Sequence, residues 1–264
     1  CEGGGVPVAG ALGWGEVGGT RGSSLGGDCC LSESTNSGVN WVEGGLRTGD
    51  RYTLDAYPYL LPSNDVVSFT PAAEGQLAPG VNAPESVTRW ISSQGLGTDG
   101  SALLELVSRL RSRGYLSHAL NLEEQATPAW MEALDDYTFI PSRSGHSLDR
   151  IDTMFTALME QQDLVGVDAS DEMLVAAIGD DEQFAVAGAL IADELGFNAR
   201  IVLGARLVEP TGEDGLSTCS SGSCAGGDMT VWLEVQDGET GRWAGIDVTP
   251  QHKTTPTPSE LQRS

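Results

Sequence analysis

The middle of the chain carries apolar residues at the spacing of helices. Val87, Trp90 and Ile91 fall on one face after Pro84, a residue that the first turn of a helix tolerates. The same period continues in later segments, with Asp, Ser and Gly at positions that can begin or end a helix. Helices are therefore predicted from Pro84 through Ile91, from Asp99 to Gly114, from Gly145 through Leu158, near Ser170 to Ile178, and from Asp180 to Gly196.

The segment from Asp99 to Gly114 is the most clearly marked of these helices. Asp99 or Ser101 can cap its amino end, and Gly114 can stop it. Its apolar stripe comprises Leu103, Leu106, Val107 and Leu110, and the arginines Arg109, Arg111 and Arg113 suit the carboxyl end of the helix dipole.

Two other regions show strand patterns. Residues 1–64 are glycine-rich without a helical period, and in their clearest strand, Asp50–Tyr57, apolar and polar residues alternate. Toward the carboxyl end, Phe197–Leu207 is mostly apolar, which predicts a central strand of a sheet. Met229–Val235 and Trp243–Val248 are predicted to complete an antiparallel set.

These patterns divide the chain into four parts and predict an α+β fold. Residues 1–64 form a β-rich module, which could be partial, and residues 65–83, rich in Pro, Gly and Ala, form a linker. Residues 84–254 form the main domain, and residues 255–264 form a flexible tail. Within the main domain, residues 120–143 show no clear period and are interpreted as an insertion or a lid.

The helix predicted from Asp180 opens with three acids. Asp180, Asp181 and Glu182 lie in its first turn, where the positive end of the helix dipole favours them. Asp180 or Asp181 can cap the free amide groups, and Gly196 is a natural carboxyl cap. The inner face of this helix is Phe184, Ala187, Leu190 and Ile191.

The strand from Met229 to Val235 has two different faces because side chains alternate along a strand. Its odd-numbered residues are aliphatic or Met and are expected in the core. Thr230, Trp232 and Glu234 share the opposite face, where Trp232 either covers a cleft or packs against neighbours.

Four motifs, in this order, resemble the core of the transglutaminase-like superfamily. They are Gly-Asp-Asp-Glu-Gln-Phe-Ala from Gly179, Leu-Gly-Phe-Asn-Ala-Arg from Leu195, Asp-Met-Thr-Val-Trp-Leu-Glu-Val from Asp228 and Asp-Val-Thr-Pro from Asp247. The cysteine position of the family falls on Asp181 and the histidine position on Thr230, while Asp247 keeps the family identity. The resemblance implies a papain-like transglutaminase core, with helices packed on an antiparallel sheet.

The resemblance extends to a subgroup of actinobacterial, membrane-anchored proteins with Asp and Thr at the two reactive positions. Gly-Tyr-Leu-Ser-His from Gly114 and Ser-Gly-His-Ser-Leu-Asp-Arg-Ile from Ser144 also resemble that subgroup. This implies an ectodomain on the extracytoplasmic face of the cell membrane, attached through segments outside this chain. Its partner would be a peptide, a protein or a cell-wall ligand.

The two altered positions cannot perform the acyl transfer of the family. That reaction needs a thiolate activated by an imidazole, whereas an Asp181 carboxylate is a poor nucleophile toward an amide and Thr230 cannot shuttle a proton. We therefore expect a pseudoenzyme with no catalytic residue, cofactor or metal ion. Two carboxylates that approach each other repel, so proximity of Asp181 to Asp247 should recruit a cation, a proton or an arginine.

The composition and net charge of the chain limit the classes of partner that it could bind. The chain has 264 residues, with 14 Lys+Arg against 38 Asp+Glu and a net charge of -24, which argues against nucleic acid and anionic membrane surfaces. A basic partner, a divalent cation or simple solubility all fit this charge. No run of about 18 apolar residues is present. The start at Cys1 fits an excised ectodomain or a mature lipoprotein.

The cysteines indicate an oxidising compartment. Cys219 and Cys224 flank a Ser/Gly loop with no histidine nearby, which favours a local disulfide over a metal site. The pairing of Cys1, Cys29 and Cys30 stays open. The histidines His118, His146 and His252 lie away from the family position and lack ligand spacing.

Three functions are compatible with these residues. The first is a binding or scaffold domain at the cell envelope, with a cleft near Glu182, Gln183 and Trp232. The second is an amide or peptide hydrolase in which Asp181 or Asp247 activates water, and it requires both carboxylates to open onto one cleft. The third is a purely structural ectodomain.

Overall fold

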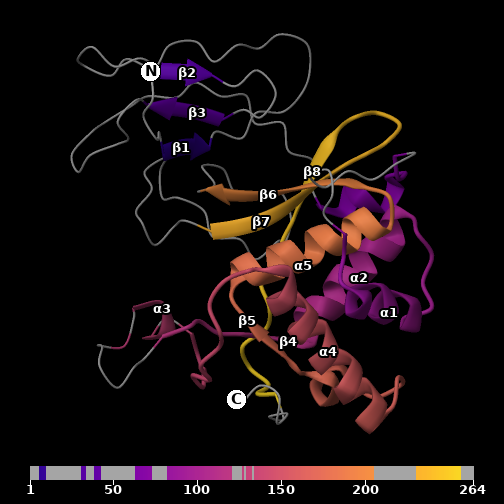
Figure 1. Ribbon diagram of the computed structural model, residues 1–264, viewed down its shortest axis with the longest axis vertical. Coiled ribbons are helices and arrows are strands. Elements are labelled where there is room, and N and C mark those ends of the chain that lie inside the picture. The colour runs from indigo at the N-terminus through magenta and orange to yellow at the C-terminus, as the bar shows by residue number, and fades with distance from the viewer. Residues whose placement is uncertain are drawn as a thin grey trace.

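The protein is a mixture of helices and small sheets (Figure 1). The structure, a computed structural model, describes residues 6–9, 31–33, 39–42, 63–72, 82–120, 127, 129–132, 134–204 and 230–256. The α+β prediction is confirmed at this coarse level. No helix among these residues is long and apolar enough to cross a membrane.

The helical elements follow the chain in this order: η1 (Ser63–Ser68), α1 (Glu85–Ser93), α2 (Gly100–Ser112), α3 (Ala129–Glu132), α4 (Leu148–Val165), η2 (Asp171–Leu174) and α5 (Asp181–Glu194). Both η1 and η2 are 3-10 helices. The strands are β1 (Val6–Ala9), β2 (Leu31–Glu33), β3 (Val39–Val42), β4 (Gly114–Leu116), β5 (Ala177–Gly179), β6 (Asn198–Gly204), β7 (Thr230–Gln236) and β8 (Trp243–Ile246).

The predicted starts of α2 and α5 are confirmed by their caps. The side chain of Asp99 accepts a hydrogen bond from the Ala102 amide at 2.9 Å, so Asp99 is the cap of α2. Asp180 accepts from the Gln183 amide at 3.0 Å at the start of α5. Such caps satisfy amide groups that have no partner inside the helix.

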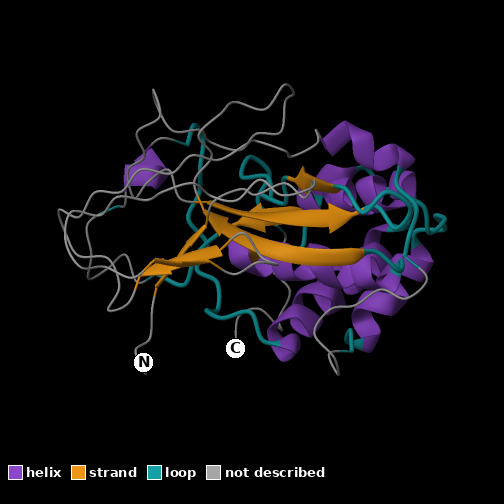
Figure 2. Ribbon diagram, turned by 90° about the horizontal axis from the view of Figure 1, so that it is seen from above, coloured by secondary structure: helices purple, strands orange, loops and turns teal. Residues whose placement is uncertain are grey.

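Helix α5 lies at the centre of the core. It contacts β6 and β7 as well as α1, α2 and α4, and Figures 1 and 2 show it between the β6–β8 sheet and these helices. Gly188 permits close packing, because a Cβ atom there would lie 3.3 Å from side-chain atoms of both Leu233 and Val248. The predicted inner face of α5 is fully buried.

The strand order of the main sheet is β6-β7-β8, and both pairs are antiparallel. The prediction that the strand after Phe197 is central was wrong, because β7 occupies the central position. Ile201 and Leu203 of β6 remain 43% and 57% exposed. An apolar strand sequence does not by itself specify which strands it will pair with.

A parallel pair, β4 and β5, was not predicted. The helix expected near Ser170 to Ile178 was wrong in its second half, since only Asp171–Leu174 is helical and Ala177–Gly179 forms β5. Gly114 does not stop α2 as a cap; Arg113 does so, and Gly114 begins β4. A Cβ atom at Gly114 would lie 2.3 Å from the Phe184 ring, so the close packing needs glycine here.

Part of the expected linker packs on the core. Val66 and Phe69 are buried in the main hydrophobic cluster, and the Gly100 amide donates to the Phe69 carbonyl at 3.2 Å. A Cβ atom at Gly100 would lie only 1.8 Å from the Val66 carbonyl oxygen. Residues 73–81 of the expected linker lie outside the described residues.

The amino-terminal strands β1, β2 and β3 form a small antiparallel sheet in the order β1-β3-β2. Residues 1–64 were expected to be rich in strands. The clearest predicted strand, Asp50–Tyr57, lies outside the described residues. Pro256, at the start of the predicted tail, is buried, and residues 257–264 lie outside the described residues.

Candidate functional site

The site predicted from the sequence lies where α5 begins. Asp180 is the helix cap, so Asp181 occupies the first helical position without being needed as a cap. Asp247 directly follows β8, and its side chain is only 3% exposed. Asp181 and Asp247 lie within electrostatic range, because the Asp247 charge acts on the Asp181 pKa.

Arg111 neutralises Asp247. Its Nη2 lies 2.5 Å from Asp247 Oδ2, and its Nε donates to the Thr249 carbonyl at 3.0 Å. The Thr249 amide donates to the other carboxylate oxygen, Oδ1, at 2.8 Å. Both oxygens of Asp247 are therefore engaged, and burial separates this carboxylate from solvent.

The surroundings of Asp181, in contrast, disfavour its charged form. Burial and the charges of Asp247 and Asp180 raise the pKa of Asp181 to about 6, and a hydrogen bond from the Thr249 side chain opposes the rise. Its Oδ1 is buried and has no hydrogen-bond partner among the described residues. Asp247 thus has an arginine partner, whereas burial, with a smaller contribution from the Asp247 charge, raises the pKa of Asp181.

Thr230 does not join this pair. It is the first residue of β7 and lies opposite Gly204 of β6. It is half-buried, and it is not among the groups that shift the Asp181 pKa. The histidine position of the resemblance therefore contributes no partner to Asp181.

Trp232 packs inside the fold. It is buried, and its Nε1 donates to Glu234 Oε1 at 3.0 Å. Arg200 pairs with Glu234 at 2.5 Å, and the Arg200 guanidinium lies 4.2 Å from the centre of the Trp243 ring. Of the two roles considered for Trp232, packing is the one observed.

Gln183 is a structural anchor. Its side chain is fully buried, and its Nε2 donates to the carbonyl oxygens of Arg143 at 2.8 Å and Gly145 at 2.7 Å. Its Oε1 accepts a hydrogen bond from Arg150 Nη2 at 3.3 Å. Gln183 thus fixes the segment before α4 against the start of α5 and does not line a cleft.

Two histidines that the sequence did not assign lie near this helix start. His146 Nδ1 is 3.6 Å from Glu182 Oε2, and both side chains are largely exposed. Burial lowers the pKa of His118, while the charges of Asp180 and Glu182 oppose that change. Both histidines belong to motifs quoted for the resemblance, but neither motif indicated that they lie near the start of α5.

The remaining predicted residues do not form a metal centre in the part of the chain that the structure describes. No group of three or more His, Cys, Asp or Glu side chains there could hold a metal ion. Cys219 and Cys224 lie outside the described residues, as do Cys1, Cys29 and Cys30, so the predicted disulfide stays a prediction.

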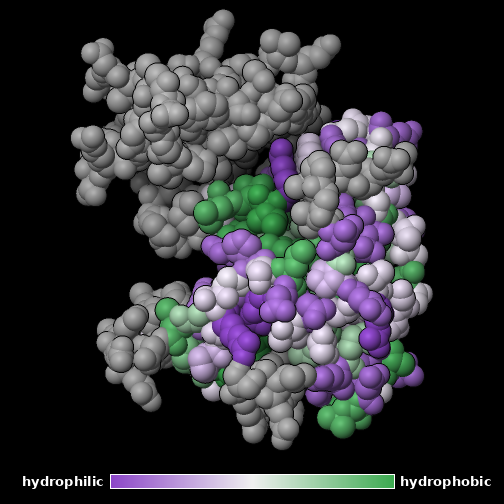
Figure 3. Space-filling view, viewed as in Figure 1, coloured by the Kyte–Doolittle hydropathy of each residue, from purple (hydrophilic) through white to green (hydrophobic). Residues whose placement is uncertain are grey.

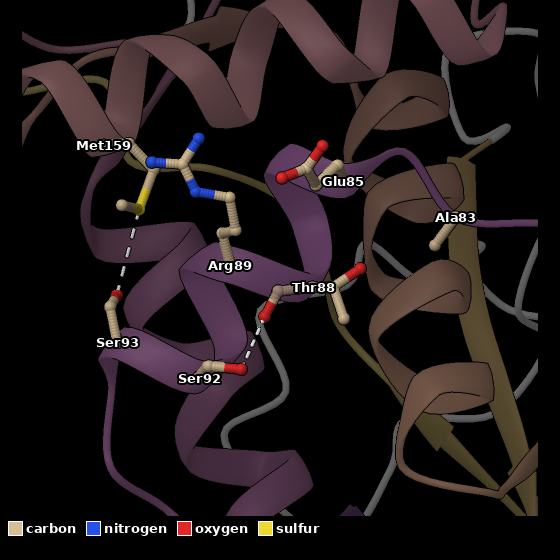
Figure 4. Close-up of a pocket in the computed structure, with 7 residues that line it drawn as sticks. All are labelled: Ala83, Glu85, Thr88, Arg89, Ser92, Ser93 and Met159. Carbon is tan, nitrogen blue, oxygen red and sulfur yellow. Dashed lines mark hydrogen bonds between the residues drawn. The ribbon is translucent and has the colours of Figure 1, made fainter.

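A shallow groove of about 760 Å³ lies elsewhere, between α1 and α4 (Figure 4). Arg89 and Glu85 provide its charged groups, and Met159 provides its apolar wall. Ser93 Oγ lies 3.9 Å from Met159 Sδ at one part of the groove. None of the residues predicted for the site lines it.

Comparison with known proteins gives no family assignment: no protein-family model, no curated protein and no solved structure matches this chain.

Proposed function

We propose that this chain is a non-catalytic, transglutaminase-like domain that binds a ligand at the amino end of α5. Its place would be the extracytoplasmic face of a cell envelope, and its ligand a peptide, a protein or a cell-wall fragment with a free ammonium group. The motifs that resemble the family support the fold part of this proposal. The environment of Asp181 supports the binding part.

The observation that carries the proposal is the contrast between two neighbouring carboxylates. Asp247 is neutralised by Arg111, whereas Asp181 keeps a buried oxygen without a hydrogen-bond partner among the described residues. A cationic group that reaches Asp181 would remove the cost of burying an unpaired carboxylate. The fold thus favours a cation at a position where the family resemblance would place a nucleophile.

The hydrolase alternative finds no support in this geometry. It requires both carboxylates to open onto one cleft, and Asp247 is buried with both oxygens engaged. A general base must be within hydrogen-bond reach of the water that it activates. The position that holds a histidine in the family offers Asp181 no proton-transfer partner, because Thr230 cannot transfer a proton.

Binding is tested with soluble cell-wall peptides that carry a free amino group and with their N-acetylated forms. We expect acetylation, or the substitution Asp181→Asn, to weaken binding by roughly tenfold, as measured by calorimetry near neutral pH. Asp149→Asn is the matched control, since Asp149 also lies in the first turn of a helix and is exposed. Equal binding of both peptide forms would contradict the proposal.

Absence of catalysis is tested separately with amide and ester substrates. We expect no turnover above that of buffer. Turnover that disappears in the Asp181→Ala variant would show that Asp181 is catalytic and would overturn the pseudoenzyme assignment.

A further inference from the structure

Apolar side chains gather on the surface where α4 ends. Leu164 is 76% exposed and Met173 is 54% exposed, and Val165 and Val167 between them are also exposed. We call this surface, formed by these four residues, the apolar tip. Figure 3 shows apolar side chains at this free end of α4. Large exposed apolar groups in one short segment commonly mark an interaction surface.

The backbone beneath the apolar tip is firmly held. Gln161 Nε2 donates to the Met173 carbonyl at 2.6 Å. Asp171 accepts hydrogen bonds from Arg113 Nε and Ser112 Oγ, each at 2.9 Å, and Leu174 is buried in the interior. The outward direction of the apolar side chains therefore belongs to a fixed surface and does not arise from a loose turn.

Side-chain hydrogen bonds join α4 to α1 just before the apolar tip begins. The groove includes Ser93 and Met159, and just beyond it Gln94 Nε2 donates to Gln162 Oε1 at 3.0 Å, which joins the two helices. Leu164 follows Gln162 by two residues. Residues two apart in a helix lie on opposite sides of it, so Leu164 points away from Gln162 and from α1.

The exposed charged side chains in the segment that carries the apolar tip are acidic. No Lys or Arg occurs between Arg150 and Arg200 in the sequence. Asp163, Asp168 and Glu172 are exposed within or beside the same segment. Acidic side chains repel an anionic membrane and a second copy of this acidic chain, and they attract a partner whose apolar residues are flanked by Lys or Arg.

We propose that the apolar tip is the docking surface for a basic, amphipathic segment of another protein. Leu164 and Met173 supply the apolar contact, and the acids around them select a basic partner. This docking is separate from ligand binding at Asp181, because the two surfaces use different residues.

The test uses two short amphipathic helical peptides, one built from Leu and Lys and the other from Leu and Glu. We expect the full chain to bind the Lys peptide and not the Glu peptide, as measured by fluorescence anisotropy. The double variant Leu164→Gln with Met173→Gln leaves the net charge unchanged and should weaken binding by about tenfold or more. Val67→Gln is the control, because Val67 is 57% exposed on η1, outside the apolar tip.

The results of this test distinguish a basic peptide from the other possible partners of the apolar tip. Equal binding by the double variant and the wild type would overturn the proposal, since binding would then be generally electrostatic. Stronger binding to anionic lipid vesicles than to the Lys peptide, or a dimer that the double variant loses, would also overturn it. The Asp181→Asn variant shows whether ammonium groups of the Lys peptide bind at Asp181 instead. Binding that is lost in Asp181→Asn but kept in the double variant would overturn the docking proposal and support the proposed function, whereas binding lost only in the double variant supports docking at the apolar tip.

Discussion

Single residues decide the chemistry of the start of α5. Asp180 is the helix cap, so Asp181 is not needed as one. Burial, together with the charges of Asp247 and Asp180, raises the pKa of Asp181. Asp247 instead receives Arg111, a residue whose position near the end of α2 suggested only an interaction with the helix dipole. The two neighbouring carboxylates thus differ in their partners: Asp247 has a cationic one, whereas Asp181 Oδ1 has no hydrogen-bond partner among the described residues.

The raised pKa of Asp181 gives a pH dependence of stability with a definite sign. The folded state holds this proton up to about pH 6, whereas the unfolded chain releases it near the ordinary value of 3.8. The contribution of Asp181 to stability is therefore fully present below about pH 4 and is lost as the pH rises through about 6.

Asp181→Asn removes this titration and the repulsion from Asp247. We expect the variant to unfold with a free energy roughly 2 kcal/mol above that of the wild type near pH 8. The difference should shrink toward zero near pH 4, where the wild-type side chain is protonated. Urea unfolding at both pH values measures this, and a variant less stable than the wild type at the higher pH would contradict the pKa assignment.

At the scale of elements, the helices could be predicted because each carries its own information. The apolar stripe of α2 and its cap at Asp99 lie within one continuous segment. The pair β4 and β5 could not be predicted in this way. Each strand has three residues, the two lie about 60 residues apart in the chain, and Tyr115 and Ile178 are buried without alternation. Their pairing depends on tertiary contacts that a local pattern does not contain.

The candidate site, too, could be predicted from the sequence only in part. Asp181 and Asp247 could be named from motifs and do approach each other. Arg111 and the buried roles of Gln183 and Trp232 depend on how separate elements meet, and the sequence carries no periodic signal for them.

A Gln183 variant tests how the segment before α4 is held to the start of α5. Gln183→Leu would leave the carbonyl oxygens of Arg143 and Gly145 without their buried donor, at a cost of about 1–3 kcal/mol. We expect the segment before α4 to open more often, so that trypsin cleaves after Arg143 faster than in the wild type. Cleavage after Arg89, which is exposed on α1, should change little. An unchanged rate at Arg143 would show that Gln183 does not hold this segment.

At the scale of the whole molecule, a stretch from outside the predicted domain completes the core. Val66 and Phe69 are buried with residues of α2, and the Thr70 amide donates to Asp237 Oδ1 at 2.9 Å. Burial raises the pKa of Asp237, but hydrogen bonds from Thr240, Thr70 and Glu239 outweigh it and lower the pKa to about 2. The turn between β7 and β8 and the segment at 63–72 are therefore joined by one carboxylate.

A substitution at Gly100 tests how residues 63–72 are attached to the core. In the Gly100→Ala variant a methyl group would have to occupy space held by the Val66 carbonyl oxygen, at 1.8 Å, so η1 must move. We expect a loss of about 1–3 kcal/mol in the free energy of unfolding and faster hydrogen exchange at the Phe69 and Thr70 amides. Gly97→Ala is the control, because nothing lies within 4 Å of a Cβ atom there. Wild-type exchange in Gly100→Ala would contradict the close packing.

The contacts of residues 63–72 have a consequence for a nicked protein. If a protease cut the chain between residues 73 and 81, Val66, Phe69 and Thr70 would still hold the amino-terminal fragment to the carboxyl-terminal one without a covalent bond. The two fragments should then elute together under native conditions and separate only in denaturant. The contacts of residues 63–72 would thus hold the two parts together independently of the chain connection through residues 73–81.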